Sequence, residues 1–168
     1  MISVDTSMVS YRRGSIKDFD DLHWSWNKPS MTKDIFRKRI ELEVQEIWVA
    51  EYKDMLIGEL HLIWVSEDKD EANGINRAYL LSYRVHPDYQ GNGVGSCLMN
   101  RVLRRIFENG FNEVTIGVEQ TEEKLVQMYN AWGFCNFIKT KVIDQHGFDS
   151  QGNPKKVPPY DLYLKSLG

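Results

Sequence analysis

Three glycines alternate with other residues in the stretch QGNGVG, Gln90 to Gly95, directly before an amphipathic run. A helix N-terminus carries unpaired N–H groups and a partial positive charge. Glycines let the backbone approach a ligand closely, so that several N–H groups point at it. The stretch therefore indicates a cradle for a pyrophosphate or, without a ligand, a helix entry through an Asn-Gly turn.

The order of the glycines restricts the nucleotide class. No Gly-Lys-Ser/Thr follows them, which excludes the P-loop of nucleotide triphosphatases. A Rossmann fingerprint fits as far as Gly93, but its third glycine position falls on Ser96. Glu119 ends the next expected strand, where a ribose-binding acid would lie. A Rossmann-type module stays the weaker alternative, because too little chain follows for a second nucleotide half.

Two further side chains have the chemistry of a proton acceptor. Glu59 and His61 are two residues apart in the strand-like run GELHLIW, so they share one face. The ordinary pKa of histidine, about 6.5, suits a general base near neutral pH. A partly exposed strand face explains the pair equally well. No histidine or cysteine spacing typical of a metal site occurs in the sequence.

Composition limits the class of protein. The chain has 168 residues, a net charge of −3 and a pI of about 5.8, typical of a single globular domain over 1–168 without a large nucleic-acid surface. No apolar run approaches the ~18 residues of a membrane helix. The first residues lack the apolar core of a signal peptide. We therefore expect a cytoplasmic protein that binds neither nucleic acid nor membrane.

The elements that position these residues follow from hydrophobic periodicity. The sequence predicts a mixed α/β fold in the order β-α-α-β-β-β-α-β-α-β-β. Ser15 is expected to cap the first helix, and Thr121 the last one. The predicted strands lie within 8–14 and at 46–52, 56–64, 78–85, 112–119, 134–143 and 160–167, with a loop over 144–159; the predicted helices are 15–27, 32–44, 94–108 and 121–132.

The run RVHPDYQGNGVGSCL, followed by MYNAWGF, resembles the GNAT superfamily of acetyl-CoA-dependent N-acetyltransferases. The core motif of that family, Gln/Arg-x-x-Gly-x-Gly/Ala, is matched by Gln90, Gly93 and Gly95. It follows a strand that ends in Val-x-Pro, as here at Val85. A second block ends in Tyr-x-x-x-Gly-Phe, matched from Tyr129 onward. The combination of the two blocks is specific for this family, whereas either block alone would be weak evidence for it.

The resemblance implies a strongly twisted mixed sheet of about seven strands flanked by about four helices. The sheet would splay open between its fourth and fifth strands, with acetyl-CoA as co-substrate in the cleft. The backbone of Tyr83, Arg84 and Val85 would then pair with the pantetheine arm and the acetyl carbonyl. The pyrophosphate would lie on the loop residues Gln90, Gly91, Asn92, Gly93, Val94, Gly95 and Ser96.

The resemblance also implies direct attack of an amine on the thioester, with Tyr129 as the general acid. Many members carry a glutamate base twelve residues before that tyrosine, but this chain has Gly117 there. Glu119, His61 and Glu59 remain as candidate bases, or water relays the proton. Many members also have a CoA-binding asparagine seven residues before the tyrosine, which is Glu122 here.

The expected acceptor is a small-molecule or peptide amine, bound by a monomer or homodimer. In the family, the first two helices and the last hairpin shape the acceptor site. Because Gly117 replaces the family's glutamate, an acyl-CoA-binding sensor or regulatory module without catalysis is the alternative function. A structural α/β domain without a ligand is a further alternative.

Overall fold

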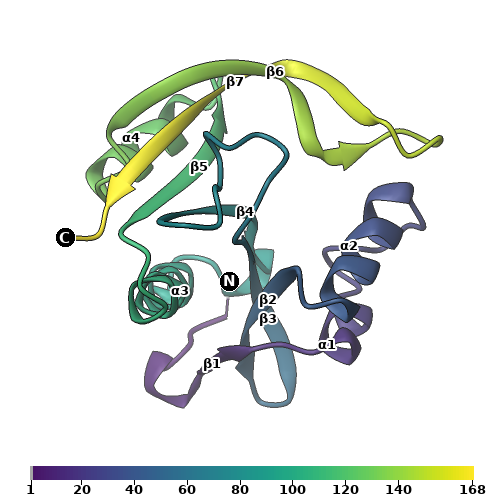
Figure 1. Cartoon of the computed structure of the whole chain (residues 1–168). Coiled ribbons are helices and arrows are strands. Elements are labelled where there is room, and N and C mark those ends of the chain that lie inside the picture. The colour runs from purple at the N-terminus through teal and green to yellow at the C-terminus, as the bar shows by residue number, and fades with distance from the viewer. Residues whose placement is uncertain (1) are drawn as a thin grey trace.

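The computed structural model describes residues 2–168. Four helices and seven strands follow one another in the predicted order (Figure 1). The helices are α1 (Ile16–Asp21), α2 (Met31–Glu41), α3 (Val94–Glu108) and α4 (Glu123–Ala131), and short 3₁₀ turns lie at Thr6–Met8 and Pro87–Tyr89. The strands are β1 (Ser10–Arg13), β2 (Gln45–Tyr52), β3 (Met55–Ile63), β4 (Arg77–Val85), β5 (Glu113–Glu119), β6 (Asn136–Phe148) and β7 (Pro154–Ser166).

All seven strands belong to one mixed sheet in the order β1-β2-β3-β4-β5-β7-β6. β4 and β5 run parallel, while the other neighbours are antiparallel. The parallel pairing extends only from Arg77↔Glu113 to Leu80↔Ile116. Beyond Leu80 and Ile116 the two strands separate, which confirms the predicted splay between the fourth and fifth strands.

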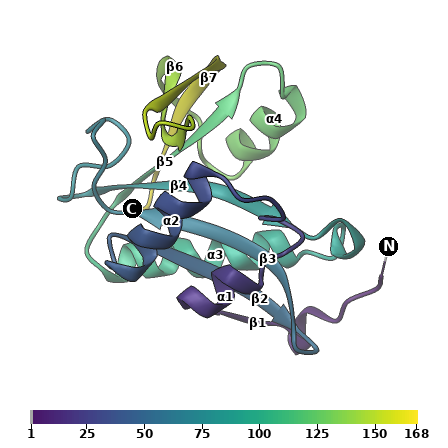
Figure 2. The ribbon, with the colours of Figure 1, turned by 90° about the vertical axis from the view of Figure 1, so that its right-hand side faces the viewer.

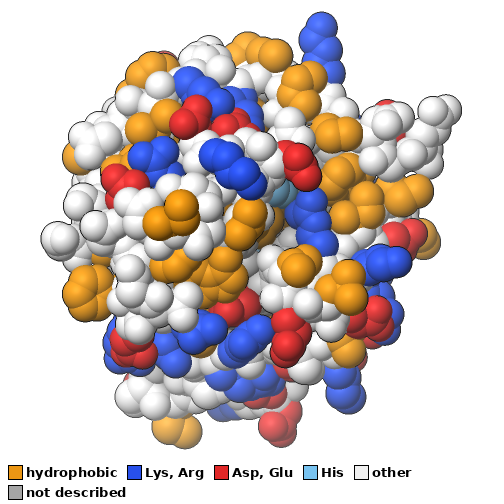
Figure 3. Space-filling view, viewed as in Figure 1, with side chains coloured by type: hydrophobic (Ala, Val, Ile, Leu, Met, Phe, Trp, Pro, Cys, Tyr) orange, Lys and Arg blue, Asp and Glu red, His pale blue; other side chains and the backbone are white. Residues whose placement is uncertain are grey.

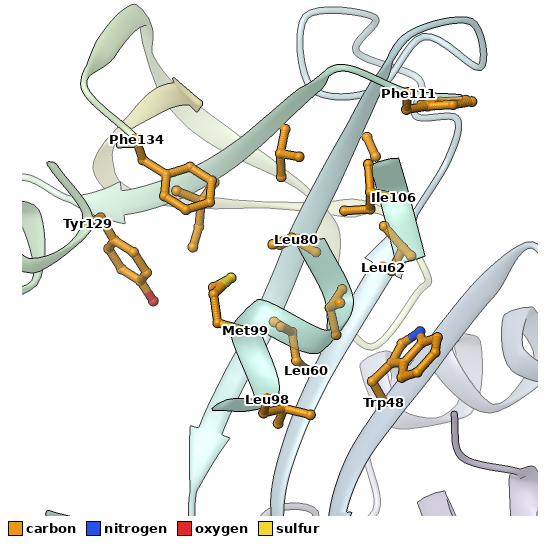
Figure 4. Packing of buried hydrophobic residues seen from close by; sticks show 14 of the residues in the cluster. Trp48, Leu60, Leu62, Leu80, Leu98, Met99, Ile106, Phe111, Tyr129 and Phe134 are labelled. Atoms are coloured by element: carbon orange, nitrogen blue, oxygen red, sulfur yellow. The ribbon is translucent and has the colours of Figure 1, made fainter. Parts of the chain in front are cut away.

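Helices cover both faces of the sheet. Figure 2 shows α1 and α2 in front of β2, β3 and β4, and α3 behind them. The apolar side of α3 packs Leu98, Met99 and Ile106 against Leu60 and Leu80 of the sheet (Figure 4). A second cluster packs α1 and α2 on the opposite face. The mixed α/β fold with seven strands and four helices is therefore confirmed.

The first helix is shorter than the predicted 15–27. Ser15 and Asp18 form a reciprocal capping box that starts α1, so the cap is more complete than the sequence indicated. The helix ends at Asp21 because the following residues turn their indoles toward the sheet. Trp24 donates from Nε1 to the Leu56 carbonyl at 2.8 Å.

The last two strands are longer than predicted, and most of the predicted loop over 144–159 is wrong. β6 and β7 continue as a two-stranded arm, with Asp144 opposite Lys155 and Phe148 opposite Pro154. The turn is confined to the few residues around Asp149, whose carboxylate accepts from the backbone of Asn153. This segment is polar and contains glycine and proline, and cross-strand pairing stabilises it. Because its apolar residues do not alternate, the sequence pattern did not predict a strand there.

One predicted cap is also wrong. α4 begins after Glu122, and no side chain caps its N-terminus, so Thr121 does not have the expected role. Gly110 and Gly133 follow their helices with φ of 84° and 98°, as expected of glycines that end a helix. No helix in the part of the chain that the structure describes is long and apolar enough to cross a membrane.

Candidate active site

The separation of β4 from β5 opens a cleft of about 630 Å³. α4 lies on one side of it, and α2 with the β6–β7 arm lies on the other. Figure 3 shows hydrophobic side chains gathered on this face between the arm and α2. Its lining residues that matter below are Trp26, Phe36, Tyr79, Arg84, Gly117, Glu119, Glu122, Tyr129, Asp144, His146 and Tyr160.

A β-bulge in β4 shapes one wall of the cleft. Glu59 pairs with Arg84 and His61 pairs with Leu81, so β4 carries one more residue than β3 between these pairs. Ser82 has the left-handed φ of 53° that accommodates the bulge. Beyond this point the edge of β4 that faces β5 has no strand partner. Its backbone groups are open to a ligand that lies in the cleft.

The glycine loop ends the same strand and starts α3. Gly91 and Gly93 have φ of 79° and 81°, a conformation that other residues rarely adopt. Gly93 is the N-cap of α3, and no side chain caps this helix. The first amides of α3 are therefore free of side-chain partners, as an anion cradle requires.

Gly95 is needed for a different reason from the other two glycines. A Cβ placed on Gly95 would lie 2.5 Å from the Tyr83 hydroxyl and 3.3 Å from a methyl group of Val85. With Tyr83 and Val85 in these positions, the absence of a side chain at Gly95 lets α3 approach β4 this closely. The motif therefore combines backbone freedom at Gly93 with close packing at Gly95.

Two polar side chains hold the loop in shape. Gln90 donates to the Val85 carbonyl at 3.0 Å. Asn92 accepts from the Val4 amide at 3.1 Å and donates to the Ile2 carbonyl at 2.9 Å. The side chain of Asn92 thus ties the first residues of the chain to the loop, which leaves its backbone amide as the group available to a ligand.

Tyr129 of α4 lies on the cleft wall and is 6% exposed. Its ring meets Phe134 edge-on at 6.0 Å between centroids and lies 6.4 Å from the Tyr83 ring. Burial raises the pKa of Tyr129 above its ordinary value of 10. The hydroxyl is therefore protonated at neutral pH and can donate a proton or a hydrogen bond.

The model of the acetyltransferase (GNAT) family matches residues 14–134, which include the glycine loop, β4, β5 and α4, but not the part of the cleft wall that the β6–β7 arm forms. The chain belongs to the GNAT acetyltransferase family. Members of this family use acetyl-CoA as the acyl donor.

Solved GNAT structures share the fold at low sequence identity. The ribosomal-protein-S18-alanine N-acetyltransferase of Escherichia coli is 14% identical with a TM-score of 0.71, covering 96% of this chain and 95% of its own. A GNAT acetyltransferase from Elizabethkingia anophelis with acetyl-CoA bound is 15% identical with a TM-score of 0.63, covering 95% and 99%. The spermidine/spermine N-acetyltransferase of Vibrio cholerae is 18% identical with a TM-score of 0.65, covering 96% and 94%.

Two of the three candidate GNAT bases lie outside the cleft lining. Glu59 and His61 are fully buried, with 2.8 Å between Oε2 and Nε2. Gln45 contacts His61 Nδ1 through its amide nitrogen at 2.9 Å, so Nδ1 accepts and Nε2–H donates to Glu59. Burial raises the pKa of Glu59, but hydrogen bonds from His61, Ser25 and Trp26 outweigh it and lower the pKa overall. The Glu59 carboxylate is thus occupied by hydrogen bonds from other side chains of the protein.

The third candidate, Glu119, is exposed and lies on the cleft at the end of β5. Gly117, two residues before Glu119, lies at the position of the usual GNAT glutamate, and neighbouring side chains occupy the space beside it. A Cβ on Gly117 would lie 2.9 Å from the Tyr160 ring and 3.1 Å from the Tyr79 hydroxyl. A glutamate side chain therefore has no room at residue 117, because two tyrosines occupy its place.

Several cleft residues were missed by the sequence analysis. Asp144, His146 and Tyr160 fall in or beside the segment that was predicted to be a loop, so nothing placed their side chains in a site. Tyr79 lies in a largely aliphatic strand whose apolar pattern concealed it. The tyrosine itself could have indicated a functional residue, because a hydroxyl in an otherwise apolar, buried strand needs a hydrogen-bond partner.

Proposed function

We propose that this GNAT protein is an N-acetyltransferase that transfers the acetyl group of acetyl-CoA to a primary amine by direct attack in a ternary complex. One observation carries the proposal. The unpaired edge of β4 and the buried Tyr129 line one cleft, and the uncapped N-terminus of α3 follows the end of that same strand after one short turn. These are the groups that would hold a thioester and receive its leaving group.

The cofactor-binding residues follow from the open backbone. The amides from Gly91 to Ser96 would hold the pyrophosphate, with Gln90 and Asn92 bracing the loop. The β4 edge at Tyr83, Arg84 and Val85 would pair with the pantetheine arm. A backbone N–H at the bulge would stabilise the thioester carbonyl oxygen as negative charge develops on it. Acetyl-CoA supplies the activated acyl group.

Tyr129 would protonate the departing thiolate. An ordinary thiol has a pKa near ~8.5, well below that of a phenol, so the thiolate is the weaker base of the two anions. Tyr129 would therefore first donate a strong hydrogen bond to the thiolate, and transfer its proton as the thiolate departs. Burial keeps Tyr129 in its protonated form. The residue is thus ready to donate throughout the neutral range.

Glu119 would accept the amine proton, directly or through water. It is the one candidate among Glu119, Glu59 and His61 that lines the cleft. We assign the other two a supporting role. Glu59 accepts from the indole of Trp26 at 3.0 Å and lies 3.4 Å from the Arg84 guanidinium, and both of these residues face the acceptor side.

The acceptor would be a small-molecule or peptide amine. The carboxylates of Asp144, Glu119 and Glu122 line the cleft together with aromatic rings, and this combination attracts a cationic group. Both kinds of acceptor occur among proteins of this fold, since one of the similar structures is a spermidine/spermine N-acetyltransferase and another is a ribosomal-protein-S18-alanine N-acetyltransferase.

One observation favours a second candidate function. The tyrosines that fill the glutamate position at Gly117 are compatible with an acyl-CoA-binding module that has no catalytic activity. Such a module would bind acetyl-CoA with the same loop and strand edge. The two functions differ only in whether the bound thioester reacts with an amine.

Calorimetric titration with acetyl-CoA, with NAD as the control, tests the binding step. We expect micromolar affinity for acetyl-CoA and none for NAD. A screen of primary amines by thiol release then tests the reaction, and we expect Tyr129→Phe to lower kcat by about 10²-fold. Absence of acetyl-CoA binding would reject the proposal. Binding without turnover on any amine would favour the inactive module.

A further inference from the structure

The hydroxyl of Tyr79 has no hydrogen-bond partner in the described part of the chain. The side chain is 5% exposed, yet within residues 2–168 the hydroxyl makes no hydrogen bond. By contrast, the neighbouring Tyr160 donates to the Ile143 carbonyl at 3.3 Å. Most polar groups of buried side chains have a protein partner, so a hydroxyl on the cleft wall that lacks one is available to a ligand in the cleft.

The position of this hydroxyl is informative. Tyr79 lies one residue before the last β4–β5 pair, at the apex of the splay. Its oxygen lies 3.1 Å from the point where a Cβ of Gly117 would be. The hydroxyl therefore lies beside the position where a glutamate side chain at residue 117 would leave the backbone of β5.

Neighbouring groups hold the Tyr79 ring in place. The imidazole of His146 stacks against it at 5.2 Å between centroids, with the planes 31° apart. The Arg39 guanidinium donates to His146 Nδ1 at 3.0 Å, and Nε2 donates to the Glu71 carboxylate at 2.9 Å. Since both ring nitrogens are engaged, His146 is a fixed wall and the Tyr79 hydroxyl has one defined direction.

We propose that Tyr79 is a further catalytic residue, whose hydroxyl binds the nitrogen of the acceptor amine. This inference rests on the proposed acetyltransferase function. The phenol oxygen accepts an N–H of the amine and so aims the nitrogen lone pair at the thioester carbonyl. The C–N bond forms as the C–S bond breaks, the amine proton passes to Glu119 or water, and the thiolate takes a proton from Tyr129.

Tyr79 acts as a neutral phenol and not as a base. Burial raises its pKa well above the ordinary value, and the charges of Glu71, Asp144 and Asp68 and the nearby Tyr160 reinforce the shift. The titratable and charged groups around Tyr79 are therefore His146, with both ring nitrogens bonded, and these four residues. The contribution of the hydroxyl should therefore be the same throughout the neutral pH range.

The substitution Tyr79→Phe removes the hydroxyl and keeps the ring. The amine probe is the one that the wild-type protein acetylates fastest among spermidine, tyramine and an alanine-terminal hexapeptide. We expect kcat/KM for this amine to fall at least tenfold, equally at pH 6.5, 7.5 and 8.5. Acetyl-CoA affinity and the urea midpoint should stay unchanged, because the hydroxyl has no protein partner to lose.

Tyr163→Phe is the matched control. Tyr163 lies on β7 and packs against Phe137 at 6.1 Å, outside the cleft lining, so its variant should keep wild-type kinetics. A Tyr79→Phe protein with wild-type kcat/KM would overturn the inference and leave the acetyltransferase function intact. Parallel losses of activity, acetyl-CoA affinity and stability would also overturn it, because they would show a structural role. A wild-type protein that acetylates none of the three amines would overturn both.

Discussion

Gly117 shows at the scale of single residues how this GNAT site departs from the family pattern. The family position of the glutamate is occupied by the Tyr160 ring and the Tyr79 hydroxyl. Gly117→Ala would place a Cβ 2.9 Å from that ring, so one of the two side chains must move. We expect a loss of about 1–3 kcal/mol in the free energy of unfolding, measured in urea.

A double-mutant cycle with Tyr160→Ala gives the control for this prediction. If the clash with Tyr160 is the cause, the double variant should be more stable than the sum of the two single losses predicts. The coupling is expected to be about 0.5–3 kcal/mol. Additive losses would show that the backbone at Gly117, and not the ring, sets the requirement for glycine.

Residues that act through backbone geometry were the more predictable ones. Gly93 and Gly95 were predicted from the spacing of the glycines and the resemblance, and the structure places them at the start of α3. Tyr79 was not predicted, because its role depends on which strand lies beside β4 and where their pairing stops. No local pattern encodes that contact.

At the scale of elements, ion pairs fasten the loop between β3 and β4 to β6, and Lys141 and Glu71 among them are buried. Lys141 contacts Asp68 at 2.7 Å and Glu71 at 2.8 Å, and Lys139 contacts Asp68 at 2.8 Å. The cluster joins segments that lie on the two sides of the splayed sheet. It therefore fixes the far wall of the cleft relative to β4.

Asp68→Asn tests this fastening through its pH dependence. Burial raises the pKa of Asp68, but Lys139 and Lys141 outweigh it and lower the pKa to about 2. Because the folded pKa lies below the unfolded value of about 3.9, the stabilisation is complete above pH 4 and is lost as the pH falls to 2. We expect the variant to be less stable by about 1–2 kcal/mol at pH 7.

Urea unfolding of both proteins at pH 7, 4 and 2.5 measures the difference. The gap between wild type and variant should shrink as the pH falls. A gap that stays constant across this range would contradict the role of the ionised carboxylate. Lys17, which pairs with Asp21 on the exposed surface of α1, offers Asp21→Asn as a control with little expected effect at any pH.

Elements with a strong hydrophobic periodicity were predicted well, whereas elements that are stabilised mainly by tertiary contacts were not. The hairpin of β2 and β3 lies within one residue of its predicted limits. The outer arm of β6 and β7 escaped prediction because its stability comes from pairing and from tertiary contacts. Thr32 of α2, for example, accepts from the Phe148 amide at 3.0 Å.

At the scale of the whole molecule, four parallel residue pairs form the strand pairing between the two halves of the sheet within residues 2–168. A ligand that contacts the β4 edge and the α3 amides should stabilise the folded state. At a concentration 100 times its Kd, acetyl-CoA should add about 2.7 kcal/mol, which raises the melting temperature of a chain of this size by roughly 5–10 °C.

Differential scanning fluorimetry with and without acetyl-CoA checks this expectation. Gly93→Val places a branched side chain at a φ of 81° and should abolish the ligand-dependent rise. The rise is compared within each variant, so a lower starting stability does not affect the result. An undiminished rise in Gly93→Val would contradict the pyrophosphate cradle.

The splay has a consequence for aggregation. Beyond Leu80 and Ile116, β4 and β5 each present an unpaired strand edge in the middle of the sheet. Exposed edges of this kind recruit strands from other chains. Here the two edges face each other across the cleft, between α4 on one side and the β6–β7 arm on the other, where a second chain has poor access. The elements that form the walls of the cleft therefore also shield the two open strand edges from uncontrolled self-association.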